Sequence, residues 1–308
     1  MTSRSADNWV LAIDGGGTCC RFALARATDP ASRAPGAQTG TERVVIEGGP
    51  ANATTNFAAT IECINQGIAS LAQTAGQDIE SVNLLPAFVG LAGVTGSAIA
   101  ARLQRELPLR HARYEEDRLA ALRGALGTRD GIVAHCGTGS FFATQRAGAQ
   151  RFAGGWGSIL GDEASAHWVG QRALSLALQQ VDGFLPATRL TDIIHQRFKH
   201  TDDIIAFAAS ATPDDYGKLA PIVTEQAQRS DKLAMQIMQA AADYIAWGVN
   251  QMDWCAGTPI CLTGGIAPHY SHYLPKEKRV DLTLPVGTPL DGAIELALAQ
   301  REHTIGYR

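Results

Sequence analysis

Apolar runs that end in glycine-bearing turns are the clearest pattern along this chain. Residues 9–14, WVLAID, are followed by the turn GGGT and then by a second apolar run at 19–25, CCRFALA. Two apolar runs joined by a short glycine-rich turn predict a β-hairpin. Further strands are expected at 43–48, in RVVIEG, and at 84–93, where LLPAFVGLAG is typical of a buried strand that ends in a glycine turn.

Apolar residues at helical spacing occupy much of the remaining chain. In residues 54–75 they recur every three or four positions, which predicts an amphipathic helix: Phe57, Ile61, Ile64, Ile68 and Leu71. The same periodicity predicts helices at about 96–107, 117–127, 162–180, 187–199, 203–210, 229–254 and 287–301. The stretch 30–40, rich in proline, glycine and alanine, is expected to be a loop.

The arrangement of the first hairpin occurs again in the second half of the chain. In residues 131–145, GIVAHCGTGSFFATQ, an apolar strand enters a glycine turn and a second apolar strand leaves it. Another strand and glycine turn follow at 259–265, PICLTGG. Identity between the halves is too low for a sequence repeat, but the architecture recurs. We therefore expect two similar α/β domains with a cleft between them.

Composition excludes several classes of protein. The chain has 308 residues, 45% of them hydrophobic and 18% charged, with a formal charge of -4, so neither nucleic acid nor an anionic membrane surface is an expected partner. No apolar run is long enough to cross a bilayer, and the N-terminus resembles no signal peptide. The six cysteines form no CxxC pair and no zinc-type spacing. A reduced, cytoplasmic protein is the simplest interpretation.

The glycine turns are candidates for phosphate binding. Glycine tolerates positive φ, so consecutive backbone N–H groups can point at one anion. Asp14 would suit a bridging Mg²⁺ held through water, although an ordinary hairpin tip explains one such turn equally well. No GK[ST] sequence follows either turn, so neither is a Walker A loop, which argues against a P-loop NTPase. The candidate phosphate-contacting residues are Gly15, Gly16, Gly17 and Thr18 in the first turn and Gly137, Thr138 and Gly139 in the second.

A third glycine turn and several polar side chains complete the candidates. Gly264 and Gly265 could let a flat ring such as adenine lie against bare backbone, or simply connect a strand to a helix. Asp117 is either a general base at a strand end or a helix N-cap.

The stretch GGWGSILGDEASAHW contains the sugar-binding candidates. Asp162 could accept hydrogen bonds from sugar hydroxyls beside Trp156 and Gly155, or only cap a helix. Asn52 is a further polar candidate, with a turn as its simpler explanation. No histidine is given a role, and His135 is expected to be a hydrogen-bonded core residue.

Together these motifs resemble one known family. The chain resembles the amino-sugar kinase branch of the BadF/BadG/BcrA/BcrD ATPase family, in the actin-like superfamily of sugar kinases. The matching segments follow the family order along nearly the whole chain: DGGGT at 14–18, GPAN at 49–52, DRLAALRGAL at 117–126, GTGS at 137–140, GGWGSILGDEAS at 154–165, LTGGI at 262–266 and GTPLDGA at 287–293.

The resemblance implies a fold, an activity and roles for the candidates. It implies two actin-like, ribonuclease H-like domains, each a mixed sheet flanked by helices, formed by residues 1–117 with 291–308 and by 118–290. It implies a homodimeric, ATP- and Mg²⁺-dependent kinase that phosphorylates the 6-hydroxyl of an amino sugar, N-acetyl-D-glucosamine first and glucosamine as the alternative. Asp117 would be catalytic and Asp14 would hold the metal. Gly264 and Gly265 would contact adenosine, and Asn52, Gly155, Trp156 and Asp162 the sugar.

One departure and two other hypotheses accompany this resemblance. Relatives carry basic or hydroxylated residues directly after DGGGT, whereas this chain has Cys19 and Cys20, with Arg21 following. An ATPase that activates a partner enzyme would need cysteines in accessible loops for a metal cluster, and only Cys255 is expected in a loop. A sugar-sensing regulator would need an added DNA-binding segment.

Overall fold

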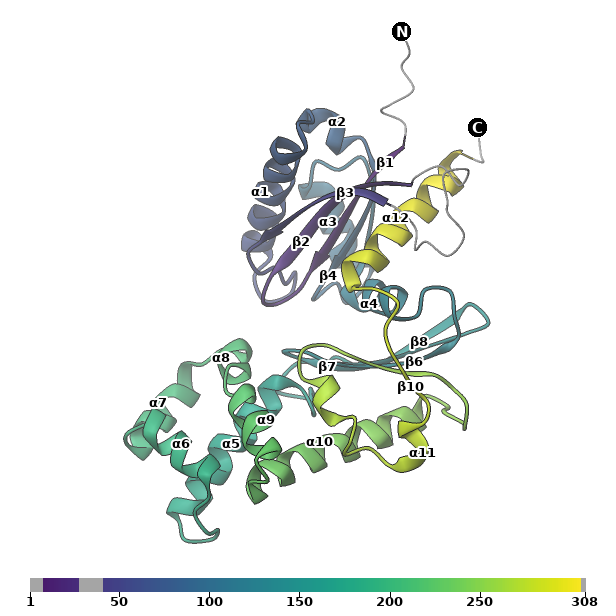
Figure 1. Cartoon of the computed structure of the whole chain (residues 1–308). Helices are drawn as coiled ribbons and strands as arrows, with labels where there is room; N and C mark the ends of the chain where they lie inside the picture. The colour runs from purple at the N-terminus through teal and green to yellow at the C-terminus, as the bar shows by residue number, and fades with distance from the viewer. Residues whose placement is uncertain (1–7, 28–40, 306–308) are drawn as a thin grey trace. The chain divides into compact units, whose positions relative to one another are not determined.

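The computed structural model describes residues 8–27 and 41–305. The chain divides into two compact units, residues 1–127 with 286–308 and residues 128–285. Figure 1 shows each unit as a sheet with helices beside it. The loop expected at 30–40 falls largely outside the described residues.

The sheet of the first unit has five strands in the order β3-β2-β1-β4-β5. Strands β1, β2 and β3 are antiparallel neighbours, whereas β4 is parallel to β1 and β5 is parallel to β4. The predicted hairpin is confirmed and forms the centre of this sheet. Its strands are β1 (Trp9–Gly15), β2 (Cys20–Ala27), β3 (Thr41–Gly48), β4 (Pro86–Leu91) and β5 (His111–Glu116).

Helices cover the first sheet because their apolar faces match its buried side chains. Ile64, Ile68 and Leu71 of α1 are buried against Leu11, Ile13 and other strand residues in one apolar core. Helix α12 packs against α4 and the central strands, and a Cβ atom added to Gly124 would lie 2.0 Å from the carbonyl oxygen of Thr288. The helices are α1 (Phe57–Ala75), α2 (Ile79–Asn83), α3 (Ser97–Glu106), α4 (Asp117–Leu126) and α12 (Pro289–Ile305).

The second unit repeats the hairpin and one parallel neighbour. Its sheet order is β10-β9-β6-β7-β8, with β6 and β7 antiparallel and β9 parallel to β6. The strands are β6 (Gly131–Cys136), β7 (Ser140–Arg146), β8 (Ala149–Gly154), β9 (Ile260–Thr263) and β10 (Leu282–Thr283). The helical segments are α5 (Ala166–Val181), α6 (Arg189–Arg197), α7 (Thr201–Ser210), α8 (Pro213–Gly217), α9 (Ala220–Gln228), α10 (Lys232–Gln251), η2 (Ala267–Tyr270) and α11 (Lys276–Arg279).

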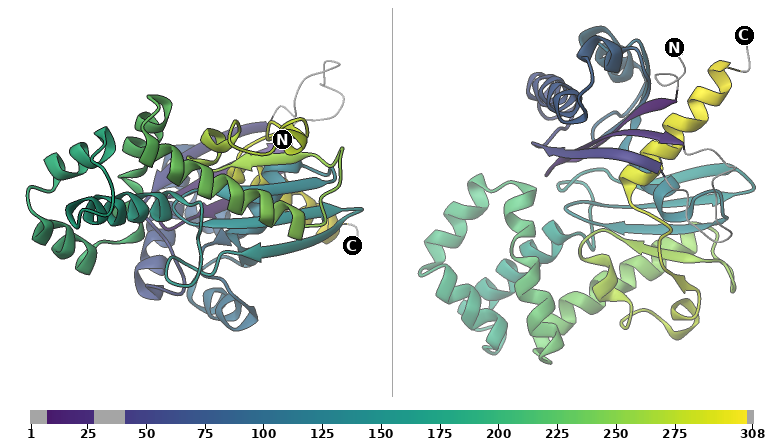
Figure 2. Two further views of the ribbon diagram at one scale, coloured as in Figure 1. Left: turned by 90° about the horizontal axis from the view of Figure 1, so that it is seen from below. Right: turned by 45° about the horizontal axis from the view of Figure 1, so that its top comes forward.

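Helices α5 to α10 form a helical region beside this second sheet (Figure 2). The apolar stripe expected along 229–254 is confirmed in α10, where Leu233, Ile237 and Ile245 are buried in the core of the unit. The helix expected from residue 162 is shorter than predicted, because α5 begins at Ala166. Two mixed sheets flanked by helices confirm the predicted fold class.

Candidate active site

Three predicted polar residues lie at one edge of the first sheet. Strands β1, β4 and β5 are parallel, so their carboxyl ends meet at this edge. Asp14 is in register with Gly90, and a Cβ atom on Gly90 would lie 3.5 Å from the Cα of Asp117. Asn52 forms a β-bridge with Ala92, which directly follows β4. The structure therefore brings Asp14, Asn52 and Asp117 to the same sheet edge.

The first glycine turn connects β1 to β2 beside this edge. A Cβ atom on Gly15 would lie 2.3 Å from Leu91 Cδ2, so a side chain does not fit there. The N–H of Gly16 donates to the carbonyl of Cys19 at 3.0 Å, whereas Gly17 is exposed with open space around it. Gly15, Gly16 and Gly17 all lack a positive φ, so the expectation that this turn uses positive φ is wrong. Space, and not backbone conformation, selects glycine at residue 15.

The end of the turn also differs from expectation. Thr18 is exposed in the turn, and Cys19 belongs to the turn and not to the strand expected from residue 19. Strand β2 begins at Cys20, whose side chain is buried.

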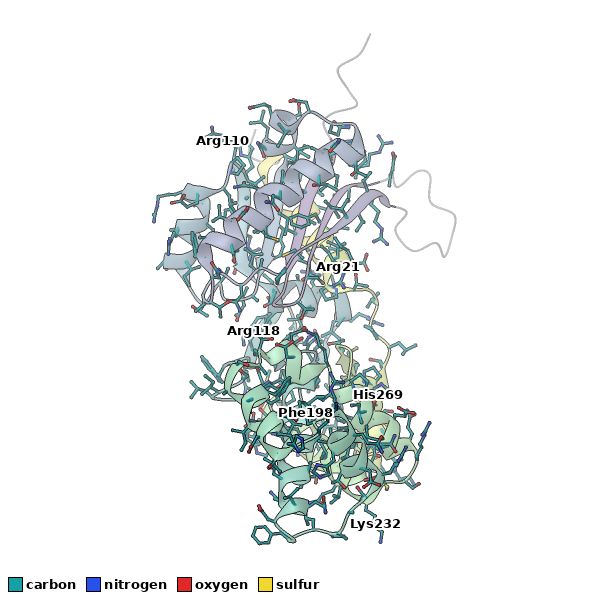
Figure 3. All side chains as sticks on the ribbon, turned by 90° about the vertical axis from the view of Figure 1, so that its left-hand side faces the viewer. Arg21, Arg110, Arg118, Phe198, Lys232 and His269 are labelled. Atoms are coloured by element: carbon teal, nitrogen blue, oxygen red, sulfur yellow. The ribbon has the colours of Figure 1, made fainter. Side chains whose placement is uncertain are left out.

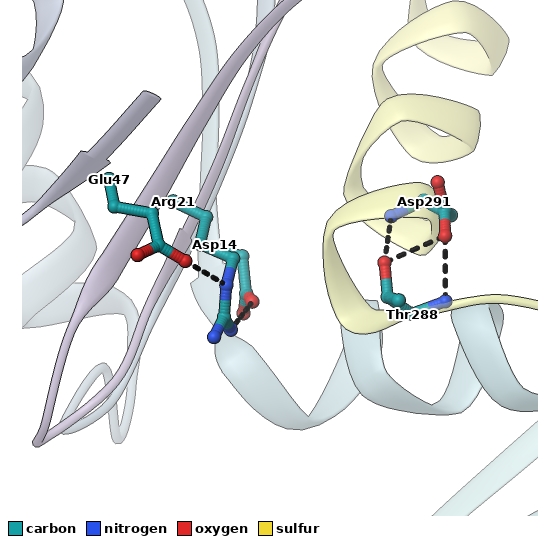
Figure 4. A network of polar contacts seen from close by, with 5 residues as sticks. All are labelled: Asp14, Arg21, Glu47, Thr288 and Asp291. Atoms are coloured by element: carbon teal, nitrogen blue, oxygen red, sulfur yellow. Dashed lines mark hydrogen bonds and ion pairs between the residues drawn. The ribbon is translucent and has the colours of Figure 1, made fainter. Parts of the chain in front are cut away.

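Asp14 carries a shielded carboxylate with a cationic neighbour. Its side chain is 13% exposed, and Arg21 Nη1 lies 3.8 Å from Asp14 Oδ2. Arg21 Nε in turn donates to Glu47 at 3.2 Å, as Figure 4 shows. Burial raises the pKa of Asp14 to about 6, and the Arg21 charge offsets part of that rise. Arg21 thus places a cation beside Asp14, on the strand that begins after Cys19.

Asp117 is the first residue of α4 and does not cap it. The N-cap position is Glu116, so the alternative interpretation of Asp117 as the N-cap is wrong. The pKa of Asp117 is raised to about 7, first by burial and then by the charges of Asp14 and Glu116, while Arg118 opposes the rise. Arg118, labelled in Figure 3, donates to Glu116. A carboxylate with a pKa near 7 is suited to accept a proton at neutral pH.

Asn52 builds a turn as well as lying at the edge. Its Oδ1 accepts the N–H groups of Thr54 at 3.0 Å and Thr55 at 3.1 Å, as in an Asx-turn. Gly93, with φ of 81°, packs against the same atom, and a Cβ there would lie 2.4 Å from Oδ1. The side-chain oxygen is therefore structural, which leaves the amide nitrogen as the group suited to a ligand.

The second glycine turn is braced by Asp162. The N–H of Gly137 donates to the carbonyl of Gly139 at 2.9 Å, which closes the turn. Asp162 Oδ1 accepts the N–H of Ser140 at 3.1 Å, and Asp162 Oδ2 would lie 2.9 Å from a Cβ on Gly139. Thr138, in the middle of the turn, is half-buried. A carboxylate thus occupies the space that a side chain at residue 139 would need.

Asp162 has an unusual backbone and does not cap α5. Its φ is 64°, and its side chain is buried. Ser165 is the N-cap of α5 and accepts the N–H of Trp168, so the alternative interpretation of Asp162 as the cap is wrong. Burial raises the pKa of Asp162, and the N–H of Ser140 opposes that shift. Aspartate and asparagine adopt this left-handed conformation more readily than other non-glycine residues.

The third glycine turn lies against the second one. Gly264 has φ of 88°, and a Cβ there would lie 2.3 Å from the Cys136 carbonyl oxygen and 2.8 Å from the Gly137 nitrogen. Gly265 is exposed with nothing within 4 Å of such an atom. Within the second unit the structure therefore unites the predicted second phosphate turn, Asp162 and the predicted adenosine turn.

The loop that contains Trp156 is the least packed part of the predicted site. The N–H of Gly155 donates to the Ser140 carbonyl at 3.0 Å, which ties the start of the loop to the second turn. Trp156 itself is 75% exposed, and the neighbouring Ile159 and Leu160 are exposed as well. The structure places Trp156 on the surface of the second unit, where its ring can cover a ligand.

The residues at the first sheet edge fit a magnesium ion. Mg²⁺ binds through one or two carboxylates together with phosphate oxygens and water. Asp14 offers a shielded carboxylate at the first glycine turn, and Asp117 lies at the same sheet edge, so a dication there would offset the charge of two acidic groups. In the part of the chain that the structure describes, no group of three or more His, Cys, Asp or Glu residues could hold a metal ion.

Sequence reasoning missed the role of Gly90. This residue separates Asp14 from Asp117 and has no side chain between them. A glycine inside the buried run AFVGL was the available signal, because glycine within a strand often marks a close approach of another group.

Among the described helices, no helix is both long enough and apolar enough to cross a membrane.

Comparison with known proteins agrees with this fold. The model of the BadF/BadG/BcrA/BcrD ATPase family matches residues 11–294. The chain belongs to this family. Over 300 residues it is 26% identical to glucosamine kinase GspK of Vibrio cholerae, covering 97% of this chain and 98% of that protein. It is also 31% identical, over 162 residues, to N-acetyl-D-glucosamine kinase of Dictyostelium discoideum, covering 48% of this chain and 51% of that one.

A solved structure of a similar protein extends the comparison. A proposed N-acetylglucosamine kinase of Chromobacterium violaceum is 29% identical and superposes with a TM-score of 0.78. The match covers 95% of this chain and 99% of that one. This member of the ATPase family therefore shares its whole fold with a protein described as an amino-sugar kinase.

Proposed function

We propose that this protein is an ATP-dependent kinase that transfers the γ-phosphoryl group to the 6-hydroxyl of an amino sugar. N-acetyl-D-glucosamine is the first candidate substrate and glucosamine the alternative. The observation that carries the proposal is the pair of shielded carboxylates at the carboxyl edge of the first sheet. The pKa of Asp14 is raised to about 6 and that of Asp117 to about 7.

Asp117 is the proposed general base. Its carboxylate orients the sugar hydroxyl and accepts the proton as the oxygen attacks the γ-phosphorus. A base whose pKa is near the working pH combines a useful deprotonated fraction with useful basicity. Its place at the start of α4, beside the ends of the parallel strands, fixes it on rigid elements.

The phosphates of ATP are assigned to the glycine turns of both units. The first turn is exposed and open at Gly17, so its backbone N–H can be approached by an anion, and the Gly137–Gly139 turn is the proposed second contact. Asp14 would hold the Mg²⁺, which neutralises charge on the β- and γ-phosphates when bound. Gly264 and Gly265 provide bare backbone for the adenosine.

The sugar is assigned to Asn52, Gly155, Trp156 and Asp162. The amide of Asn52 lies at the same sheet edge as Asp117, and the buried carboxylate of Asp162 can accept a hydroxyl hydrogen bond through an oxygen not used by Ser140. The ring of Trp156 is available to cover the C–H face of a sugar. The two relatives described as glucosamine and N-acetylglucosamine kinases support an amino sugar and leave the acetyl group open.

An assay of ADP release against a panel of sugars tests the proposal. The panel holds N-acetylglucosamine, glucosamine, N-acetylmannosamine and glucose, each with Mg-ATP. We expect an amino sugar to stimulate ADP release well above the rate without sugar, with kcat/KM highest for one of the first two. Equal rates with every sugar and with none would refute the kinase proposal.

Oligomeric state and location belong to the same proposal. We expect a homodimer acting in the cytoplasm, as the family resemblance implies. Light scattering coupled to size-exclusion chromatography tests the dimer, and a single mass of 32.6 kDa at micromolar concentration would exclude it.

The alternative of an activating ATPase has no specific support in the structure. A cluster would need cysteines in accessible loops. Cys20, Cys136 and Cys261 are buried, whereas Cys255 is exposed and Cys19 and Cys63 are half-buried. An absorbance band near about 400 nm in the anaerobically purified protein, as iron–sulfur clusters give, would support this alternative.

A further inference from the structure

His135 lies where the second glycine turn begins. It is the second-last residue of β6, directly before Cys136 and the turn. In the sheet it is in register with Thr263 on β9 and with Phe141 on β7. The three side chains therefore form one row across three strands, since directly paired residues share a face of a sheet.

Both neighbours in this row hold the His135 ring. Its Nδ1 shares a hydrogen bond with Thr263 Oγ1 at 3.1 Å. On the other side the ring stacks on Phe141, with centroids 4.8 Å apart and an interplanar angle of 18°. Burial lowers the pKa of His135 to about 4, so the ring is neutral near pH 7 and one nitrogen donates while the other accepts.

The free edge of the ring faces the glycine turn. His135 Nε2 would lie 3.0 Å from a Cβ atom on Gly137. Gly137 lacks a positive φ, so its backbone conformation alone does not require glycine. The imidazole therefore occupies the space that a side chain at residue 137 would need, and it packs against the turn.

The partner of the ring belongs to the third glycine turn. Thr263 directly precedes Gly264, which packs on the Cys136 carbonyl, and the N–H of Ile266 donates to that carbonyl at 3.2 Å. The hydrogen bond between His135 and Thr263 thus joins the strand that leads into the proposed phosphate turn to the strand that leads into the proposed adenosine turn.

We propose that His135 is a positioning residue for ATP. Through Thr263 it fixes the separation of the turns at Gly137–Gly139 and Gly264–Gly265, which bind the two ends of one nucleotide. This inference rests on the proposed function, because it requires that these turns bind ATP. It extends that function by a residue with no part in the chemistry.

A set of matched variants tests the inference. Thr263→Val removes the hydroxyl at similar volume, Thr263→Ser keeps it, and His135→Phe keeps a stacking ring without nitrogen. His135→Asn places a polar atom where Nδ1 was. Thr283→Val is the control, because Thr283 lies in the same sheet and its hydroxyl contacts Cys261 Sγ at 3.2 Å. For each variant, the Kd of a non-hydrolysable ATP analogue, both KM values, kcat and Tm are measured.

The expected result is selective for the nucleotide. Thr263→Val and His135→Phe should each raise the Kd and KM for ATP about 3- to 10-fold, as for loss of one ordinary hydrogen bond, and the double variant should add little. The sugar KM and kcat should stay within about twofold, and Thr263→Ser, His135→Asn and Thr283→Val should stay close to native.

Two outcomes separate this inference from the function it rests on. Unchanged ATP affinity in folded Thr263→Val and His135→Phe, with only a lower Tm, would overturn the positioning role while leaving the kinase intact. If Thr263→Val does not fold, the comparison of His135→Phe with His135→Asn decides alone. A native protein that does not bind the ATP analogue would instead refute the proposed function.

Discussion

The two glycine turns start from the same hairpin topology and differ in their surroundings. The turn at residues 15–18 is open at its tip, with ordinary φ at each glycine and two shielded carboxylates nearby. The turn at 137–139 is enclosed by Asp162, His135 and Gly264. Two glycine turns of the same hairpin topology can thus differ in how their surroundings pack around them. The first turn leaves open space near two shielded carboxylates, whereas the shape of the second turn is set by the residues packed around it.

Replacing Asp117 by Asn should have the largest effect. Loss of a general base lowers kcat by about 10²–10⁴-fold, while binding of an ATP analogue should remain near native. Steady-state kinetics and calorimetry measure the two quantities. Asp202→Asn is the matched control, because Asp202 lies in the first turn of α7 in the other unit and is exposed. Near-native turnover of the Asp117 variant would remove this residue from the mechanism.

Replacing Asp162 tests whether the enclosed turn also holds the sugar. A hydrogen bond to a charged group is worth about 1.5–3 kcal/mol, so Asp162→Ala should lower kcat/KM for the sugar roughly 10- to 100-fold. The kcat/KM of Asp162→Asn should lie between the values of the native protein and of Asp162→Ala, because Asn tolerates the positive φ and retains an acceptor for the Ser140 N–H. Lower thermal stability with unaltered sugar kinetics would refute direct sugar binding by Asp162.

A pair of glycine variants tests this contrast in packing, with Gly264 chosen because this residue of the third turn packs on the start of the second turn. Gly264→Ala forces a side chain onto the Cys136 carbonyl at positive φ and should lower the free energy of unfolding by about 1–3 kcal/mol or more. The side chain added by Gly17→Ala meets open space, so this variant should change the free energy of unfolding by less than about 0.5 kcal/mol. Urea denaturation of both variants provides the comparison. Equal losses would show that the turns are not distinguished by packing.

The raised pKa of Asp117 predicts a pH dependence. Below about pH 7 the base is protonated, so kcat/KM should fall about tenfold per pH unit. The folded state also holds this proton more tightly than the unfolded chain does, so the associated stability is present below the ordinary value of 3.8 and is lost as pH rises to about 7. Urea titrations between pH 5 and 8 should show a smaller loss for Asp117→Asn. Flat kcat/KM between pH 5.5 and 8 would contradict the assignment.

The sequence predicted the elements well where apolar periodicity was strong. Both hairpins, α1 and α10 were expected from residues such as Ile64 and Ile237, which are buried. The strands β8 and β10 and the helices α2, α8, α9 and α11 were not expected. These segments are short and their apolar residues form no long repeat, so tertiary packing decides their conformation.

The candidate site could be predicted as a set of residues but not as a geometry. The positive φ expected in the first turn is absent, because the need for glycine at residue 15 arises from Leu91, a distant residue in sequence. The cap alternatives were also wrong: neither Asp117 nor Asp162 is an N-cap, although α4 begins at Asp117 as expected. A cap depends on the exact first helical residue, which periodicity leaves uncertain by a few positions.

The most direct test of the account asks whether phosphoryl transfer requires the sugar 6-hydroxyl. ADP release by the native protein is measured with the preferred amino sugar, with its 6-deoxy analogue, and with no sugar. The account predicts rapid ADP release with the first and only background release with the other two, while the 6-deoxy analogue competes with the sugar for binding. Equal ADP release with the 6-deoxy analogue would contradict transfer to the 6-hydroxyl, and equal release without sugar would contradict a sugar kinase altogether.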